Sequence, residues 1–394
     1  MRDIQDLVTT IFSRIVALLS SFGLVLLSTM MLGSEGRGYI SLTITDAAIV
    51  AIFANVFAGS SAMFYLKKIG EAKVFFTALI WILLVSLIGT SIINLIHPVN
   101  FLILFLLTSV LSFQALVYNQ LFAKQLFVKG NFFAVIIQVI FFLCLVVIWS
   151  QGIYFDWELY FKIQIIIWFI ISILFVRPMK LELATWKELK SICTYGFKNE
   201  LSYLLQFFSY RLTYFYIYFQ LGINDLGVFG VSIIIAESIW VISRSFSSVS
   251  YSKQLHDEKE INSIQRTNNY FKITFFISLI ALLILLLIPE VWYTFVFSDE
   301  FSNIKTILTV LSPGILAVAA SNIIGHFFAA SNKQGILILK SSVGLLFTAI
   351  LTPFFIKEYG LWGGALAMSI SYLFSSFVLF FAYLTKVLKK KTVI

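Results

Sequence analysis

Residues 273–288 read ITFFISLIALLILLLI, sixteen positions without one charged side chain. A second run, Phe101–Val110, reads FLILFLLTSV and is also free of charge. Because no water reaches the backbone inside a bilayer, a spanning segment must be a helix or a strand of a closed barrel. Barrel strands alternate apolar and polar residues, and neither run alternates. Both stretches therefore predict membrane-spanning helices.

The rest of the chain has the same character. Its 394 residues are 60% hydrophobic and only 12% charged, with 42 phenylalanines, whereas about a quarter of the residues in a soluble domain are charged. A spanning helix needs about 20 apolar residues. We therefore predict an all-α integral membrane protein with about 12 transmembrane helices in two six-helix lobes around a central cavity. The expected spans are residues 10–32, 39–64, 75–96, 101–124, 131–149, 159–176, 196–219, 227–247, 270–288, 305–330, 334–354 and 361–385.

Lysine and arginine are distributed unevenly between the loops. With the N-terminus inside, 21 of the 28 lie in inner loops and tails, and 4 lie in outer loops, among them Arg37 in the loop Gly33–Gly38. An excess of basic residues marks cytoplasmic loops, so both termini are expected in the cytoplasm. The net charge of +9 is then a topology signal, and nucleic acid is not an expected partner. The first apolar run lacks a small-residue cleavage site, which favours a retained helix.

The longest inner segments include Arg177–Phe197, where apolar residues alternate with lysines. This composition suits a helix lying on the membrane surface, and the segment divides the chain near its middle. We predict an N-terminal lobe at 1–180, a cytoplasmic interfacial linker at 181–195 and a C-terminal lobe at 196–394.

Glycine and proline mark expected turns and breaks. Leu32-Gly33 and Leu221-Gly222 each follow the first helix of a half, and glycine suits a sharp reversal of the chain. Six helices per half imply a parallel repeat with a site near the bilayer midplane. Ser312-Pro313-Gly314 predicts a break or kink in the tenth helix.

Several charged residues fall well inside the predicted helices. A charge at a helix centre costs about 2.5–3.5 kcal/mol on insertion scales, so most of these side chains should face protein or water. Snorkelling or structural pairing is an equal alternative for the two nearest the cytoplasmic ends, Arg14 and Glu200; for Arg211 and Glu237 we favour a functional cavity. The six residues are Arg14, Asp46, Glu200, Arg211, Glu237 and Arg244.

The turn between the seventh and eighth helices predicts which of these charges meet. Arg211 and Glu237 lie at equal depth on either side of the turn, so they should be neighbours, and the same count places Glu200 near Arg244. Helical spacing also puts a row of tyrosines on the face of Glu200 and Arg211. The row could alternatively belong to an aromatic belt at the membrane interface. Its members are Tyr203, Tyr210, Tyr214 and Tyr218.

Motifs for soluble chemistry are missing from the sequence. There is no GxxxxGK[ST] phosphate-binding loop, no HExxH and no Cys/His cluster, which are the usual marks of ATPases and metalloenzymes. Cys144 and Cys193 lie at opposite expected depths, so no disulfide is predicted. We predict no catalytic residue, no metal and no cofactor, and the protein is not expected to be an enzyme.

Four stretches carry a resemblance to a known family: Leu32–Tyr39 (LGSEGRGY), Trp186–Gly196, Gly227–Phe229 and Tyr359–Ala365 (YGLWGGA). In this order, and across the whole chain, they resemble the polysaccharide or O-antigen flippases of the multidrug/oligosaccharidyl-lipid/polysaccharide (MOP) superfamily, which have a MATE-like fold. The chain differs at Thr213-Tyr214, where many of these proteins carry an acidic–basic pair.

The resemblance implies a multi-pass protein of the bacterial inner membrane. It would turn a polyprenyl-pyrophosphate-linked oligosaccharide, an O-antigen or capsule repeat unit, from the cytoplasmic to the outer leaflet by alternating access. Its partners would be this lipid-linked cargo, membrane lipid and other polysaccharide-assembly membrane proteins, and H+ or Na+ or the cargo gradient would drive it. Two alternatives are a multidrug/cation antiporter of the same fold and a membrane polysaccharide polymerase or ligase. The predicted substrate-binding residues are Arg14, Arg211, Arg244, Tyr203, Tyr210 and Tyr214, with Asp46, Glu200 and Glu237 for ion coupling or charge pairing.

Overall fold

The computed structural model is helical, and the residues that it describes contain no strand. It describes the backbone of residues 2–254, 260–331 and 333–391, and the side chains of residues 16–388 apart from 18, 202, 248, 249, 252, 253, 255–261 and 332. The chain divides into two compact units, Met1–Leu204 and Leu205–Ile394. The lobe and linker limits predicted from the sequence stay a prediction.

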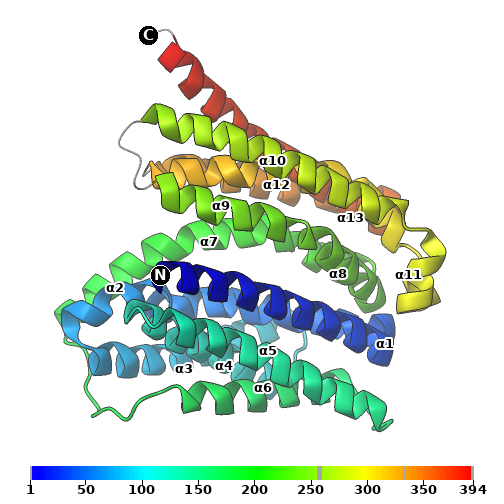
Figure 1. Cartoon of the computed structure of the whole chain (residues 1–394). Coiled ribbons are helices and arrows are strands. Elements are labelled where there is room, and N and C mark those ends of the chain that lie inside the picture. The colour runs from blue at the N-terminus through cyan, green and yellow to red at the C-terminus, as the bar shows by residue number, and fades with distance from the viewer. Residues whose placement is uncertain (1, 255–259, 332, 392–394) are drawn as a thin grey trace. The chain divides into compact units, whose positions relative to one another are not determined.

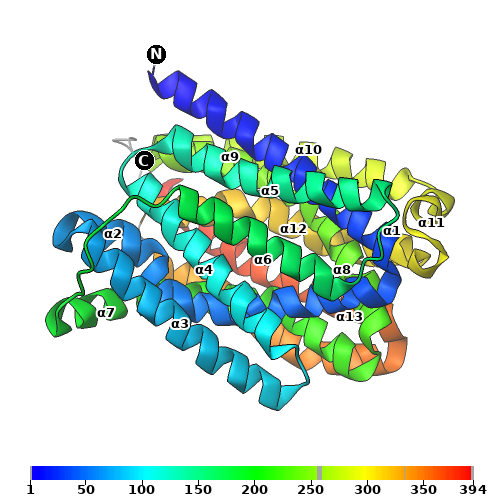
Figure 2. The ribbon, with the colours of Figure 1, turned by 90° about the horizontal axis from the view of Figure 1, so that it is seen from below.

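Unit 1 is built around a closely packed aromatic and aliphatic core. Phe133, Phe141 and Phe161 are fully buried there, as expected of a dense interior. Helix α4 packs against both α3 and α6, and α1 contacts α3, α4 and α5 (Figures 1 and 2). The elements are α1 (Arg2–Ala58), α2 (Ser60–Ile69), α3 (Glu71–Ile96), α4 (Phe101–Ala123), α5 (Phe127–Ser150), α6 (Trp157–Leu174) and the first part of α7 (Trp186–Gln220).

Unit 2 is organised around α12, which packs against α8, α9, α10 and α13. One apolar cluster of this unit includes Phe327, Phe328 and Leu379, and is closed by the ring of Tyr383. After the last part of α7, the elements are α8 (Ile223–Ser238), α9 (Trp240–Gln254), α10 (Glu260–Leu287), α11 (Glu290–Phe297), a 3-10 turn (Asp299–Phe301), α12 (Ile304–Ala330) and α13 (Gln334–Lys391).

Single glycines reverse the chain at three places. Gly33 inside α1 has φ 63° and ψ −165°, Gly360 inside α13 has φ 60° and ψ −137°, and Gly222 before α8 has φ 105° and ψ −177°. Positive φ combined with extended ψ is essentially restricted to glycine. The sharp reversals predicted at Gly33 and Gly222 are confirmed.

The outer loop predicted at Gly33–Gly38 is wrong beyond its first residue. The helix resumes directly after Gly33, because one glycine is enough to turn the chain. Arg37 therefore lies within a helix, 3% exposed, and its guanidinium donates a hydrogen bond to Ser28 Oγ at 3.0 Å. Polar partners inside the unit replace the water that this arginine was expected to meet.

Nine stretches of the described chain are long and apolar enough to cross a membrane. Two of them, Leu19–Ile69 and Gln334–Leu388, contain a glycine reversal and so supply two crossings each. Helix α7 is 35 residues long but more polar, and it is not among the nine. Counting each hairpin twice and adding α7 gives the twelve spans that the sequence predicts.

A break at Ser312-Pro313-Gly314 is wrong, because α12 continues through Pro313; the alternative, a kink, stays a prediction. Proline cannot donate the hydrogen bond that the carbonyl of Thr309 would otherwise receive. The hydroxyl of Ser312 donates to that carbonyl instead, at 2.7 Å. A Cβ on Gly314 would lie 2.7 Å from the Cα of Ser369 on α13, so the glycine serves the close approach of two helices.

The predicted surface helix of the linker starts only at Trp186, because residues 176–185 are not helical. The start of α7 is a capping box. The backbone N–H and the hydroxyl of Thr185 donate to Glu188 Oε2 at 2.7 and 2.9 Å, and the Glu188 N–H donates to Thr185 Oγ1 at 3.5 Å. The cap fixes where the extended segment ends.

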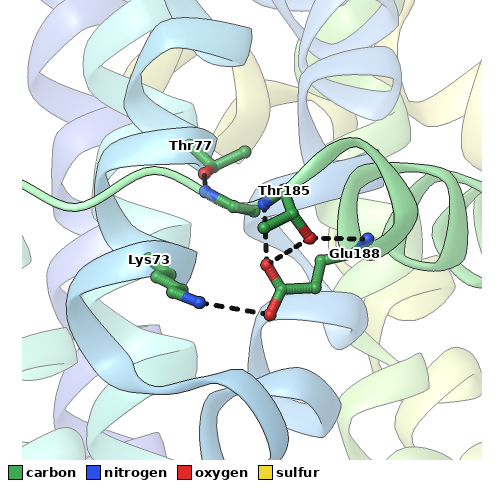
Figure 3. A network of polar contacts seen from close by, with 5 residues as sticks. Lys73, Thr77, Thr185 and Glu188 are labelled. Atoms are coloured by element: carbon green, nitrogen blue, oxygen red, sulfur yellow. Dashed lines mark hydrogen bonds and ion pairs between the residues drawn. The ribbon is translucent and has the colours of Figure 1, made fainter.

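The same cap attaches the linker to α3 (Figure 3). The Ala184 N–H donates to Thr77 Oγ1 at 3.0 Å, and Lys73 Nζ lies 3.3 Å from Glu188 Oε1. These contacts lie wholly within unit 1. The segment that leads from α6 to α7 is therefore attached to α3 at its α7 end.

Candidate functional site

The strongest candidate site lies in unit 2, where Arg211 of α7 meets Glu237 of α8. Two parallel hydrogen bonds join them, from Nη1 to Oε1 at 2.7 Å and from Nη2 to Oε2 at 2.8 Å. Such bidentate, charge-assisted bonds are among the strongest in proteins. The side chains are 23% and 16% exposed, so the pair is shielded but accessible. This is the contact that their equal depths predict.

Aromatic rings surround this ion pair. The guanidinium carbon of Arg211 lies 5.0 Å from the ring centroid of Tyr214, within the range of a cation–π contact. Tyr210, Trp240 and Tyr372 form a triangle with centroid separations of 5.5, 5.1 and 5.5 Å. Trp240 and Tyr372 are fully buried, so Tyr210 is the ring of this triangle that a ligand can reach. A partly exposed aromatic ring close to a fixed cation suits a ligand that combines sugar rings with negative charge.

The predicted tyrosine row does not act as one surface. Tyr210 belongs to the aromatic triangle, while Tyr214 is buried and packs edge-on against Phe229 at 5.7 Å. Tyr203 belongs to unit 1 and is 67% exposed. Of the three tyrosines predicted to bind substrate, the structure thus places Tyr210 and Tyr214 close to Arg211 and Tyr203 in the other unit.

The remaining predicted charges lie apart from the pair or outside the description. Arg244 is exposed on α9, and its guanidinium carbon lies 5.9 Å from the Trp240 ring centroid. Trp240 therefore contacts this second arginine as well as the two tyrosines of the triangle. The side chain of Arg14 lies outside the described residues. Glu200 is half-buried in unit 1, beside Gly59. Its predicted proximity to Arg244 stays a prediction.

A second candidate lies in unit 1, where Asp46 Oδ1 is 3.3 Å from His97 Nε2. The two side chains are 1% and 3% exposed, and Asp46 Oδ2 has no hydrogen-bond partner among the described residues. Sequence reasoning missed His97. Counting gives the two residues similar depths, since Asp46 is 24 residues before the turn at Gly70 and His97 is 27 residues after it, but it does not show that they face each other.

Other polar side chains in unit 2 serve helix packing. The side-chain amide of Asn322 donates to Ser243 Oγ at 2.9 Å, and the rings of Tyr251 and His326 are 5.8 Å apart. The described part of the chain contains no group of three or more His, Cys, Asp or Glu residues that could hold a metal ion.

Neither a family model nor a curated protein sequence matches this chain. Solved structures do. An inward-facing multidrug resistance MATE family transporter of the MOP superfamily aligns with a TM-score of 0.75 at 14% identity, over 95% of this chain and 96% of its own. The lipid II flippase MurJ, in an inward closed conformation, aligns with a TM-score of 0.77 at 18% identity, over 96% of this chain and 87% of its own. The chain has the MATE-like fold.

The MATE-like fold confirms the predicted fold class, an all-α, multi-pass membrane protein. At these identities the likeness establishes the fold alone. A MOP superfamily transporter from Pyrococcus furiosus, with a TM-score of 0.59 at 11% identity over 96% of this chain and 94% of its own, is described as having a binding pocket of reverse polarity. Within this fold, the charge of a site therefore has to be read from each chain's own residues.

Proposed function

We propose that this protein is a flippase for polyprenyl-pyrophosphate-linked oligosaccharide, an O-antigen or capsule repeat unit. It would carry the unit from the cytoplasmic to the outer leaflet of a bacterial inner membrane by alternating access. The observation that carries the proposal is Arg211, a fixed cation among aromatic rings in a chain with the MATE-like fold. No side chain in this proposal has to make or break a covalent bond.

The bidentate geometry suggests how cargo would bind. A diphosphate presents paired oxygens that match the guanidinium fork, as a carboxylate does. It can therefore replace Glu237 as the partner of Arg211. The displaced carboxylate, shielded and without its arginine, would need another cation. This exchange would link cargo binding to the coupling ion, H+ or Na+.

The aromatic triangle and the second arginine extend the site. Tyr210 offers its partly exposed ring to the sugars next to the diphosphate, the buried Trp240 supports that ring, and Arg244 adds a second positive charge beside Trp240. Arg14 and Tyr203, which the sequence predicts to bind substrate, are proposed as further contacts to the cargo. The polyprenyl chain can remain in the bilayer while the polar head moves.

A multidrug/cation antiporter is the second candidate, and one observation favours it. Asp46 is buried and its Oδ2 atom has no hydrogen-bond partner among the described residues. An intramembrane carboxylate of this kind suits a proton or a cationic ligand. Glu200 would be a further carboxylate for such a ligand.

Charge variants of Arg211 test the flippase proposal in cells whose sole copy is the variant. Arg211→Glu should abolish surface polysaccharide, and Arg211→Lys should retain more than Arg211→Ala, because a lysine keeps the charge but loses the fork. Lys357→Glu, at an exposed position on α13, is the control and should export normally. Normal surface polysaccharide from Arg211→Glu at normal membrane abundance would reject the cationic mechanism.

The orientation is tested separately. Reporter fusions after Lys391 and within Arg177–Phe197 should both report the cytoplasm, as the distribution of basic residues predicts. A periplasmic signal at either position would reject the proposed topology with both termini inside.

A further inference from the structure

Unit 1 has an apolar groove of about 870 Å³ between α3, α4 and α6. Its floor is buried and includes Phe75 and Phe113, and its rim includes Ile170, which is 53% exposed. The hydroxyl of Ser109, a polar lining residue, donates a hydrogen bond to the backbone carbonyl of Phe105 at 2.7 Å. The groove therefore presents hydrocarbon along its length.

One end of the groove carries a positive charge. Arg177, three residues beyond the end of α6, lines the groove and is exposed. Within the described residues it makes no ion pair, whereas Lys73 and Lys124 at the same end of unit 1 are paired with Glu188 and Glu71. Its guanidinium is thus available to an anion from outside the chain.

The length of the groove matches one leaflet. Along α6 the lining runs from Ile165 to Ile173, a rise of about 12 Å at about 1.5 Å per residue. Half of a bilayer's hydrocarbon core is about 15 Å thick. A chain lying in the groove with its head at Arg177 would therefore end near the bilayer midplane.

Arg177 lies near the start of a segment that is anchored at both limits. The segment begins where α6 ends at Leu174, and it is attached to α3 near α7 through Ala184 and Thr77 and through Lys73 and Glu188. Lys180 in the same segment and Lys187 at the start of α7 are basic as well. Basic residues beside a pocket between transmembrane helices are a known setting for anionic lipid head groups.

We infer that this groove binds an anionic phospholipid, with one acyl chain between α3, α4 and α6 and its phosphate on Arg177. The inference does not depend on what the protein transports. An acyl chain that ends within one leaflet fits the length of the groove, and a net negative head group complements an arginine that has no ion-pair partner among the described residues. The lipid would hold the segment between α6 and α7 against the helices of unit 1 that form the groove.

Native mass spectrometry on the full-length protein in detergent tests this. Phosphatidylglycerol and phosphatidylcholine with identical acyl chains are titrated in parallel. Phosphatidylglycerol should bind about fivefold more tightly, and Arg177→Gln should remove this difference, since one basic residue near an anionic lipid contributes about that factor. Lys180→Gln removes a charge from the same segment between α6 and α7 but outside the groove lining, and it should keep the preference for phosphatidylglycerol.

Filling the groove tests the apolar half of the site. Ile170→Trp should abolish the bound lipid, while Leu87→Trp, on the lipid-exposed part of α3 outside the groove, should not. Thermal unfolding of each variant confirms that the fold is intact. The inference is rejected by equal binding of the two lipids, by equal effects of Arg177→Gln and Lys180→Gln, or by full binding to Ile170→Trp. Displacement of the phospholipid by an equimolar polyprenyl phosphate would reject it too, in favour of that occupant.

Discussion

Removing both members of the Arg211–Glu237 pair should destabilise the protein by less than the sum of the two single substitutions. A hydrogen bond to a charged group contributes about 1.5–3 kcal/mol, and losing one partner of a fully buried ion pair costs about 3–5 kcal/mol. Here the side chains are 23% and 16% exposed, so water screens part of the uncompensated charge. We therefore expect each single substitution to cost about 3 kcal/mol and the coupling between them to be about 2 kcal/mol.

The assay is a double-mutant cycle on the full-length protein in detergent. Arg211→Gln, Glu237→Gln and the double variant are unfolded by denaturant, and the coupling energy is the deviation of the double variant from additivity. A matched cycle on Lys162 and Glu158 is the control, because these side chains are 55% and 35% exposed on one helix. Exposed pairs of this kind couple by less than about 0.5 kcal/mol. Additivity at Arg211 and Glu237, or a coupling no larger than the control, would refute the account of this site.

Three further predictions concern other parts of the chain. Asp46→Asn and His97→Gln should each change the dependence of export on external pH while the protein stays folded. If both variants have the same pH profile as wild type, this pair has no role in ion coupling. Gly33→Ala should lower the free energy of unfolding by about 1–3 kcal/mol, because φ of 63° with extended ψ strains any other residue. The control Gly325→Ala should be neutral or slightly stabilising, since the nearest neighbour of its new Cβ would be 3.6 Å away. The hydrogen bonds of the capping box, and then the neighbouring lysine, lower the pKa of Glu188, so its stabilising effect is present above the ordinary glutamate pKa and is lost as the pH falls through the lowered value. Glu188→Gln should therefore reduce thermal stability at neutral pH and match wild type in acid, and an equal loss at both pH values would contradict this reasoning.

Local chain properties made much of this protein predictable from its sequence. Uncharged apolar runs such as Ile273–Ile288 predict membrane helices because only a helix satisfies its own backbone in lipid. Gly33 and Gly222 predict reversals because a sharp turn can require a backbone conformation that only glycine adopts without strain. Arg211 and Glu237 could be paired by counting, since two residues equally far from one tight turn lie at the same depth.

Tertiary structure decided the properties that depend on lateral neighbours. Counting gives the depth of a side chain but not the helix that it faces, so the pairing of Asp46 with His97 and the burial of Arg37 emerged only from the packed unit. The continuity of α12 through Pro313 likewise depends on a hydroxyl one residue away and on the helix that packs against Gly314. Hydropathy and spacing describe one helix at a time, whereas burial, hydrogen bonding and the groove at Arg177 arise where several helices meet.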